Sequence, residues 1–235
     1  MAKKGHTTYM TVPERWLGGA LFLTYLLVLP FVTGPLFRGL ELLLGFELSA
    51  HTENLIYYYV LFALTVLIFW SFLGRTTGHF LANTPSAVKT AVMGLVCFYG
   101  LNELSYRALR LLIGGFSNLN DMTISAQVND APRSTFFIVV FLAPFVEEVL
   151  FRGYVFGNLR EKHRTAAYLI SCGLFAFLHV WQFAVVEQSL RYFLLMLQYL
   201  VPGLVFARCY EKSGTLWAAI LPHMFVNALA MRGIL

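Results

Sequence analysis

Three short polar motifs interrupt apolar segments in the second half of the chain. They are, in order, Glu147-Glu148-x-x-x-Arg152, Phe175-x-x-x-His179 and His223-x-x-x-Asn227. A carboxylate beside an imidazole can deprotonate a water molecule and direct it at a carbonyl carbon. N–H donors one helical turn apart can stabilise the oxyanion that forms. The residue types therefore indicate hydrolysis of an amide or an ester.

The first motif divides its two carboxylates between different helix faces. Glu148 and Arg152 are four residues apart, so on a helix they share a face and can form an ion pair. Glu147 points about 100° away, because each residue turns a helix by that angle. The pattern predicts that Glu147 is free to do chemistry while Glu148 and Arg152 neutralise each other. The alternative is a structural ion pair with a surplus acid.

The other two motifs place imidazoles and an amide inside apolar segments. His223 and Asn227 are also at i and i+4 and share a face. Taken singly, His179 is equally well explained as a packed histidine, and the His223–Asn227 pair as an interhelical hydrogen-bonding pair. We expect the three motifs to converge on one hydrated cavity. A rise of about 1.5 Å per residue leaves Glu147 and His179 offset by about 10 Å, which tilted helices would absorb.

The three motifs resemble the signature motifs of the CPBP family (CAAX protease and bacteriocin-processing, also called Abi) of intramembrane proteases. Their order and spacing agree, and the resemblance covers roughly 134–232. It implies that Glu147 activates water with help from His179. It also implies that His223 and Asn227 form the oxyanion site, and that Glu148 and Arg152 hold the first glutamate in place.

The resemblance leaves a zinc alternative, because members of this family are often labelled metalloproteases. Zinc would be held by Glu147, His179 and His223, with an open fourth position for water. The chain has no His-Glu-x-x-His motif, the usual helical zinc signature. We favour a metal-free glutamate mechanism and expect no cofactor.

The composition shows which elements must position these residues. The 235-residue chain is 58% hydrophobic and 12% charged, whereas soluble domains carry roughly a quarter charged residues. A membrane-spanning helix needs about 20 mostly apolar residues. Seven segments qualify: 16–37, 54–73, 87–106, 134–157, 166–186, 189–207 and 215–232. We therefore predict an all-α, polytopic transmembrane bundle of about seven to eight spans, with the active site in a cavity between the C-terminal helices.

Two further segments are not predicted to span the membrane. The stretch 39–49 is too short to span and is either an interfacial helix or an extension of the first span. The polar stretch 114–133 predicts a long loop. It divides the chain into N-terminal helices with this loop (1–133) and a catalytic core (134–235).

Basic residues predict the orientation through the positive-inside rule. With the N-terminus in the cytoplasm, the inner segments hold ten basic residues and the outer segments six. The inner ones are Lys3, Lys4, Arg15, Arg75, Lys89, Arg160, Lys162, Arg164, Arg208 and Lys212, and the outer ones are Arg38, Arg107, Arg110, Arg133, Arg191 and Arg232. The net charge of +5 is spread over short loops, which disfavours a nucleic-acid partner.

Three functions remain open at this level. The favoured one is an intramembrane endopeptidase acting on a peptide or a membrane protein's terminus. A second is a non-enzymatic membrane protein that binds a peptide toxin, as in bacteriocin immunity, or serves as a scaffold. A transporter is less favoured, because transporters usually show paired halves with broken helices. The small size and sparse loops are typical of a bacterial plasma-membrane protein.

Overall fold

The computed structural model describes residues 10–114 and 118–232, and within these it consists of helices and connecting turns with no strand. The first part begins with a continuous rod that crosses a short π-helical stretch. It then folds back through three further helices. These elements are α1 (Val12–Leu23), η1 (Thr24–Val28), α2 (Leu29–Leu44), α3 (Ala50–Ile68), α4 (Trp70–Ala82) and α5 (Thr84–Ile113).

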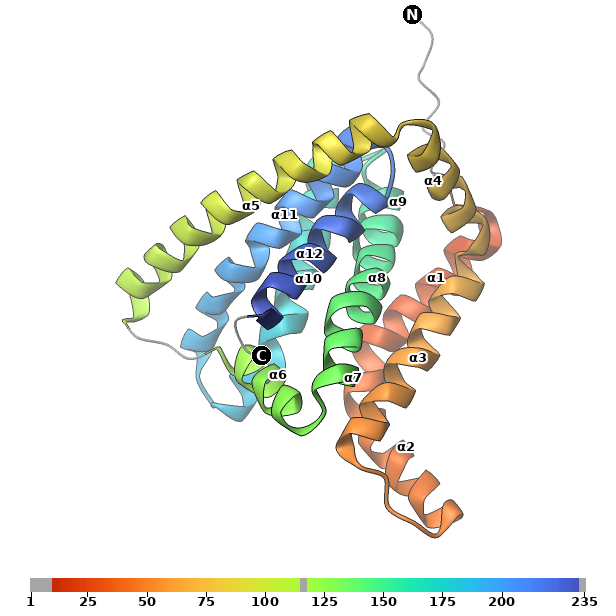
Figure 1. Cartoon of the computed structure of the whole chain (residues 1–235), viewed down its shortest axis with the longest axis vertical. Coiled ribbons are helices and arrows are strands. Elements are labelled where there is room, and N and C mark those ends of the chain that lie inside the picture. The colour runs from red at the N-terminus through yellow and green to blue at the C-terminus, as the bar shows by residue number, and fades with distance from the viewer. Residues whose placement is uncertain (1–9, 115–117, 233–235) are drawn as a thin grey trace, which may run out of the picture.

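The second part contains another rod in which α-helical and π-helical turns alternate. This central rod comprises α7 (Pro132–Phe137), η2 (Ile138–Leu142), α8 (Ala143–Glu147), η3 (Glu148–Phe156) and α9 (Gly157–Leu159). Before it lies α6 (Leu119–Asp130), and after it come α10 (Arg164–Val186), the 3₁₀-helix η4 (Leu190–Leu195), α11 (Met196–Ser213) and α12 (Trp217–Arg232). Figure 1 shows the central rod between α3 on one side and α10 and α12 on the other.

The predicted all-α polytopic bundle is confirmed. Five described helical segments are long and apolar enough to cross a membrane: Val12–Leu44, Ala50–Ile68, Pro132–Leu159, Arg164–Val186 and Leu190–Ser213. The two other predicted spans, 87–106 and 215–232, fall on α5 and α12. The stretch 39–49 begins as an extension of the first rod, which ends where Gly45 adopts a left-handed φ of 77°.

The prediction of a loop over 114–133 is wrong, because Leu119–Asp130 forms the helix α6. The helix begins at Asn118, whose side chain accepts a hydrogen bond from the backbone N–H of Asn120. Asp121 in its first turn also favours a helix start, since the positive end of the helix dipole attracts a carboxylate. Pro132 then begins the central rod. The many Asn and Asp residues are caps and polar helix residues here.

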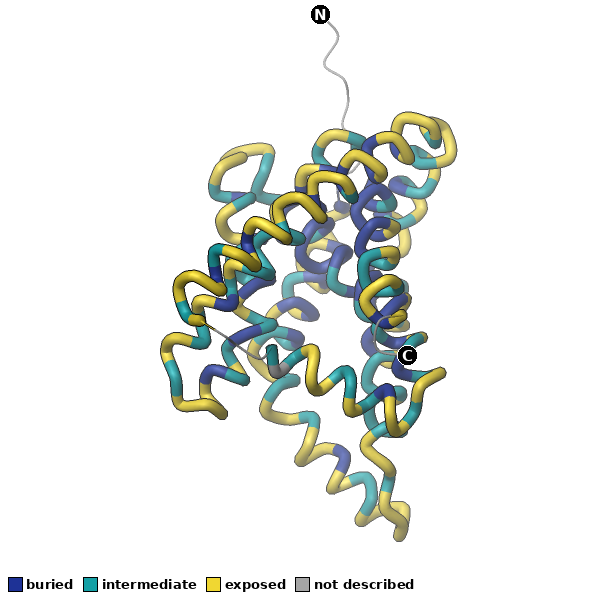
Figure 2. The backbone as a smooth tube through the Cα atoms, turned by 60° about the vertical axis from the view of Figure 1, so that its left-hand side comes forward, coloured by how far each residue is buried: buried dark blue, intermediate teal, exposed yellow. Residues whose placement is uncertain are grey.

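The central rod is the most enclosed of the five spans. About 67% of its most apolar window is buried, against 11–33% for the other four. Figure 2 shows this as a dark-blue interior surrounded by exposed yellow segments. Many of the exposed side chains are large and apolar, as expected for surfaces that face lipid. The two adjacent glutamates thus lie on the helix that is shielded best from the surroundings.

Hydrogen bonds from α4 fix the start of α12, the helix that carries His223 and Asn227. The Thr76 hydroxyl accepts from the Leu216 backbone N–H at 2.7 Å, and the Thr215 hydroxyl donates to the Thr76 carbonyl at 2.9 Å. The Trp217 indole N–H donates to Thr77 at 2.8 Å. The first bond satisfies a backbone N–H at the start of the helix. Together the three bonds anchor α12 to the first part of the chain.

Candidate active site

Glu148 and Arg152 form a buried ion pair on the central rod, as the i,i+4 spacing predicts. The Arg152 Nη1 lies 3.0 Å from Glu148 Oε1, and both side chains are fully buried. The guanidinium also lies over the Phe175 ring, 4.2 Å from its centroid, which adds a cation–π attraction. Arg152 is therefore fixed between the central rod and α10.

His223 attaches to the same ion pair from α12. Its Nδ1 lies 2.8 Å from Glu148 Oε1, and its ring stacks on Phe206 at 4.9 Å. An ionised carboxylate only accepts hydrogen bonds, so Nδ1 carries the proton in this contact. The opposite ring nitrogen, Nε2, then faces Glu147 at 3.8 Å from Oε2.

His179 approaches Glu147 from α10 in a similar way. Its Nδ1 lies 2.8 Å from the Phe175 carbonyl oxygen of its own helix. A carbonyl only accepts, so Nδ1 again carries a proton. The Nε2 atom lies 3.9 Å from Glu147 Oε1. The ring stacks against Tyr199 at 4.7 Å between centroids, which holds its plane.

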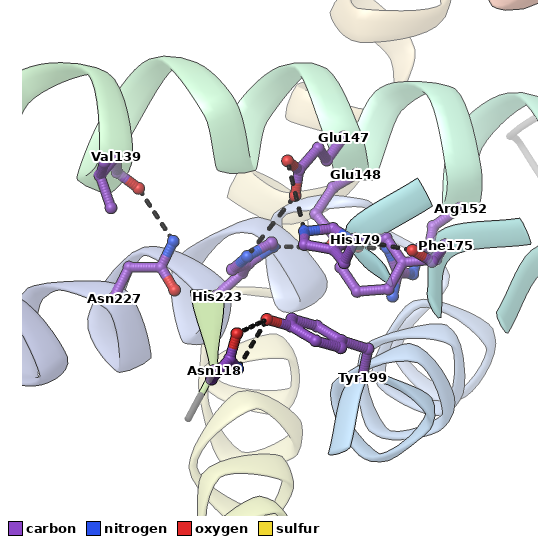
Figure 3. Close-up of polar contacts among 10 residues, drawn as sticks. All are labelled: Asn118, Val139, Glu147, Glu148, Arg152, Phe175, His179, Tyr199, His223 and Asn227. Carbon is purple, nitrogen blue, oxygen red and sulfur yellow. Dashed lines mark hydrogen bonds and ion pairs between the residues drawn. The ribbon is translucent and has the colours of Figure 1, made fainter. Parts of the chain in front are cut away.

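Each carboxylate oxygen of Glu147 thus faces one imidazole nitrogen: Oε1 faces His179 and Oε2 faces His223 (Figure 3). Separations of 3.8 and 3.9 Å exceed a direct hydrogen bond but suit a water molecule that bridges the groups. The expected offset of about 10 Å along the helices does not separate Glu147 from His179, because their side chains lie 3.9 Å apart.

Asn227 lies one turn after His223 and lines the same cavity. Its amide nitrogen donates to the Val139 carbonyl in η2 at 2.9 Å, as Figure 3 shows. Carbonyls displaced by π-helical turns often accept from other groups, and such turns are frequent at functional sites. One amide N–H therefore ties α12 to the central rod, and the second is left for another acceptor.

Two cavities meet at Glu147 and His179. The larger has a volume of about 920 Å³ and extends between α5, α6, α11 and α12. The smaller, of about 350 Å³, lies between η1, α2, α3 and α10. Both are also lined by Asn54 and Tyr58 of α3, two residues that our sequence analysis missed. Their i,i+4 spacing in an apolar segment was the available signal.

Tyr199 connects the His179 imidazole to the start of α6. Its hydroxyl contacts the Asn118 side chain at 2.9 and 3.2 Å while its ring stacks on His179. We expect Tyr199→Ala to lower kcat by about 10- to 100-fold, because His179 loses the surface that holds its plane and small misplacements are costly. Tyr199→Phe keeps the ring and should retain most activity.

Peptide-cleavage rates of purified variants check this role for Tyr199. Tyr106→Ala, at a position 43% exposed on α5, serves as the control for removing a tyrosine. Equal losses in Tyr199→Phe and Tyr199→Ala would contradict stacking and assign the effect to the hydroxyl.

A zinc ion would need ligand atoms at about 2.0–2.2 Å around one point. The described residues contain no cluster of three His, Cys, Asp or Glu side chains that could hold a metal ion. The Nε2 atoms of His179 and His223 do face Glu147, but at the separations given above. Zinc binding by these three residues stays the alternative to the favoured metal-free mechanism.

The fold and site are those of a polytopic helical membrane protein with a carboxylate and two imidazoles enclosed between its helices. Residues 130–229 match the family model described as type II CAAX prenyl endopeptidase Rce1-like. This match agrees with the resemblance of the three motifs to the CPBP family of CAAX proteases. The match supports a CAAX-protease-like intramembrane endopeptidase. No curated protein and no solved structure was found to match the chain.

Proposed function

We propose that the protein is an intramembrane endopeptidase in which Glu147, assisted by His179, activates the water that attacks a peptide carbonyl. One observation carries the proposal. The Glu147 carboxylate lies 3.8–3.9 Å from two imidazole nitrogens at the junction of two cavities. A water held there has a base on one side and room for a substrate carbonyl on the other.

The proposed reaction proceeds through a tetrahedral intermediate. Glu147 takes a proton from water as the water oxygen bonds to the carbonyl carbon, and the C=O electron pair moves to oxygen. His223 Nε2–H and the free N–H of Asn227 donate to that oxyanion. The negative charge of Glu148, 2.8 Å from His223 Nδ1, stabilises the imidazolium that this requires. The C–N bond then breaks, and the leaving nitrogen receives the proton from Glu147.

A peptide library incubated with purified protein in lipid vesicles tests the function. We expect cleavage products by mass spectrometry, and we expect the rate to be unchanged after chelation, because the proposed water activation needs no metal. Activity lost on chelation and restored by zinc would contradict the metal-free mechanism. Absence of cleavage, with retained binding of a peptide, would favour the binding or immunity function instead.

We also propose that the N-terminus faces the cytoplasm, as the bias of basic residues favours. Single cysteines introduced at the α9–α10 turn, for example Lys162→Cys, should react with a membrane-impermeant reagent only from the cytoplasmic side. Labelling from the outer side of intact cells would reverse the orientation.

A further inference from the structure

The two cavities share part of their wall. The described residues that line both are Asn54, Tyr58, Asn120, Glu147 and His179. Glu147 and His179 carry the proposed chemistry, while the other three have no role in it. The junction of the cavities therefore offers polar groups beyond those that activate water.

Asn54 and Tyr58 lie on one face of α3, which runs beside the central rod (Figure 1). They are four residues apart, so the helical period points both side chains the same way. Phe62, one further turn along this face, packs on Phe145 of α8 with the ring centroids 4.9 Å apart. Glu147 ends the same short helix. Packing between the two helices therefore fixes the polar face of α3 close to Glu147.

Neither polar side chain is occupied by a contact within the described part of the chain. The Asn54 amide and the Tyr58 hydroxyl have no hydrogen-bond partner among the described residues, and both side chains are only partly buried. The Tyr58 ring is nevertheless held in place, because it meets Tyr57 edge to face at 5.0 Å between centroids. A polar group enclosed away from water costs free energy until it is paired. Both groups are therefore available to a ligand in the cavities.

The spacing of these two groups matches an extended peptide. Four residues of a helix rise by about 6 Å, and two residues of an extended chain rise by about 6.6 Å. Along one edge of an extended chain, the backbone hydrogen-bonding groups recur at every second residue. A tyrosine hydroxyl can donate to a peptide carbonyl, and an asparagine amide can donate to a carbonyl or accept from an N–H. Such uncharged groups can bind the backbone of any sequence.

We propose that Asn54 and Tyr58 bind the backbone of an extended substrate segment where it crosses from one cavity to the other. Two successive backbone groups on one edge of the segment pair with the two side chains, and this holds the neighbouring peptide bond at Glu147. The inference rests on the proposed peptidase function and adds a substrate-binding element to it. This element lies on α3, outside residues 130–229, which the family model matches.

Removing one polar group at a time tests the proposal. We expect Tyr58→Phe and Asn54→Leu each to lower kcat/KM by about three- to tenfold, the contribution of one hydrogen bond. The loss should appear in KM, because the contact is made to the bound substrate as well as in the transition state. The matched controls are Tyr59→Phe, at a position that is 51% exposed, and Asn129→Leu, at the exposed end of α6. Unchanged kinetics, or a loss confined to kcat, would overturn the proposal for that residue.

Stability distinguishes substrate binding from packing. Tyr58→Phe keeps the ring and removes a hydroxyl that has no partner among the described residues. We therefore expect it to unfold at the same temperature as the wild-type protein or at a higher one. A lowered unfolding temperature that accounts for the lost activity would assign the hydroxyl to the fold and overturn its role in binding.

Substrates with altered backbones locate the contacts. A peptide that the wild-type protein cleaves is prepared as a series in which one amide at a time, other than the scissile one, is replaced by an ester. An ester lacks the N–H, and its carbonyl is a weaker acceptor. We expect one replacement to slow the wild-type protein but not Tyr58→Phe, and another, about two residues away, to slow the wild-type protein but not Asn54→Leu. Effects that add to those of both variants at every position would overturn the proposal.

Binding separates this proposal from the proposed function. Fluorescence anisotropy of a labelled peptide measures affinity without cleavage. If no peptide is cut, the peptidase function fails, while weaker binding to Tyr58→Phe and Asn54→Leu than to the controls would still support the contacts on α3. If peptides are cut but both variants bind them as tightly as the wild-type protein does, the proposal for α3 alone fails.

Discussion

Glu147→Gln is expected to lower kcat/KM for peptide cleavage by about a thousandfold, within the range that a positioned general base contributes. Glutamine keeps the size and the polar character of the side chain but cannot accept the proton from water. The two imidazole nitrogens at 3.8 and 3.9 Å would still hold a water molecule. They would lack the carboxylate that makes it a nucleophile.

The same variant should fold normally. The Glu147 carboxylate makes no hydrogen bond to another described residue, and its side chain retains 12% exposure to the cavity. We expect the free energy of unfolding to change by less than about 1 kcal/mol, in the range of substitutions that leave no buried group unpaired. A large loss of activity with unchanged stability identifies chemistry as the defect.

Steady-state cleavage and thermal unfolding of the same preparation check the Glu147 prediction. Glu161→Gln, on the exposed turn after the central rod, is the matched control and should retain full activity. Less than a tenfold loss in Glu147→Gln would show that another group activates the water. Glu147→Asp adds a geometric test, because it keeps the charge but withdraws it by one methylene.

Local helix geometry was predictable for the pair on the central rod. The i,i+4 rule placed Glu148 beside Arg152, and the structure has them at 3.0 Å. The rule concerns one helix only, so it gave no information about the His223 contact with Glu148 at 2.8 Å. That contact arises from the packing of α12 against the central rod. Glu148 therefore contacts His223 as well as its counterion Arg152.

The first part of the chain contributes residues that no motif identified. Asn54 and Tyr58 reach the cavities because α3 packs on the central rod. The helical period predicts that Asn54 and Tyr58 share one face of their helix. It does not predict which other helix packs against that face. Helix α6 was missed for another reason. It has almost no apolar periodicity, and only its start signals, Asn118 and Asp121, distinguish it from a polar loop.

Breaking the Glu148–Arg152 pair is expected to produce the largest loss of stability. Arg152→Met leaves the fully buried Glu148 carboxylate without its main counterion. Removing one partner of a buried ion pair typically costs about 3–5 kcal/mol. The exposed i,i+4 pair Glu103–Arg107 is the matched control, and Arg107→Met should cost less than about 1 kcal/mol.

A double variant separates stability from function at this pair. Glu148→Leu with Arg152→Met replaces both charges by apolar groups, which is often neutral or stabilising for buried pairs. We expect it to unfold at a higher temperature than Arg152→Met alone. Activity should stay low, since His223 Nδ1 no longer has the acceptor that aims Nε2 at Glu147.

Thermal unfolding in detergent and cleavage rates give the two readouts. If the double variant recovered both stability and activity, Glu148 would be only a counterion for Arg152. Recovery of stability without activity would assign it the orienting role. The buried pair would then serve catalysis by holding His223. That role would explain why a second glutamate lies beside the reactive one on the most buried of the five spans, although a buried ion pair adds little stability.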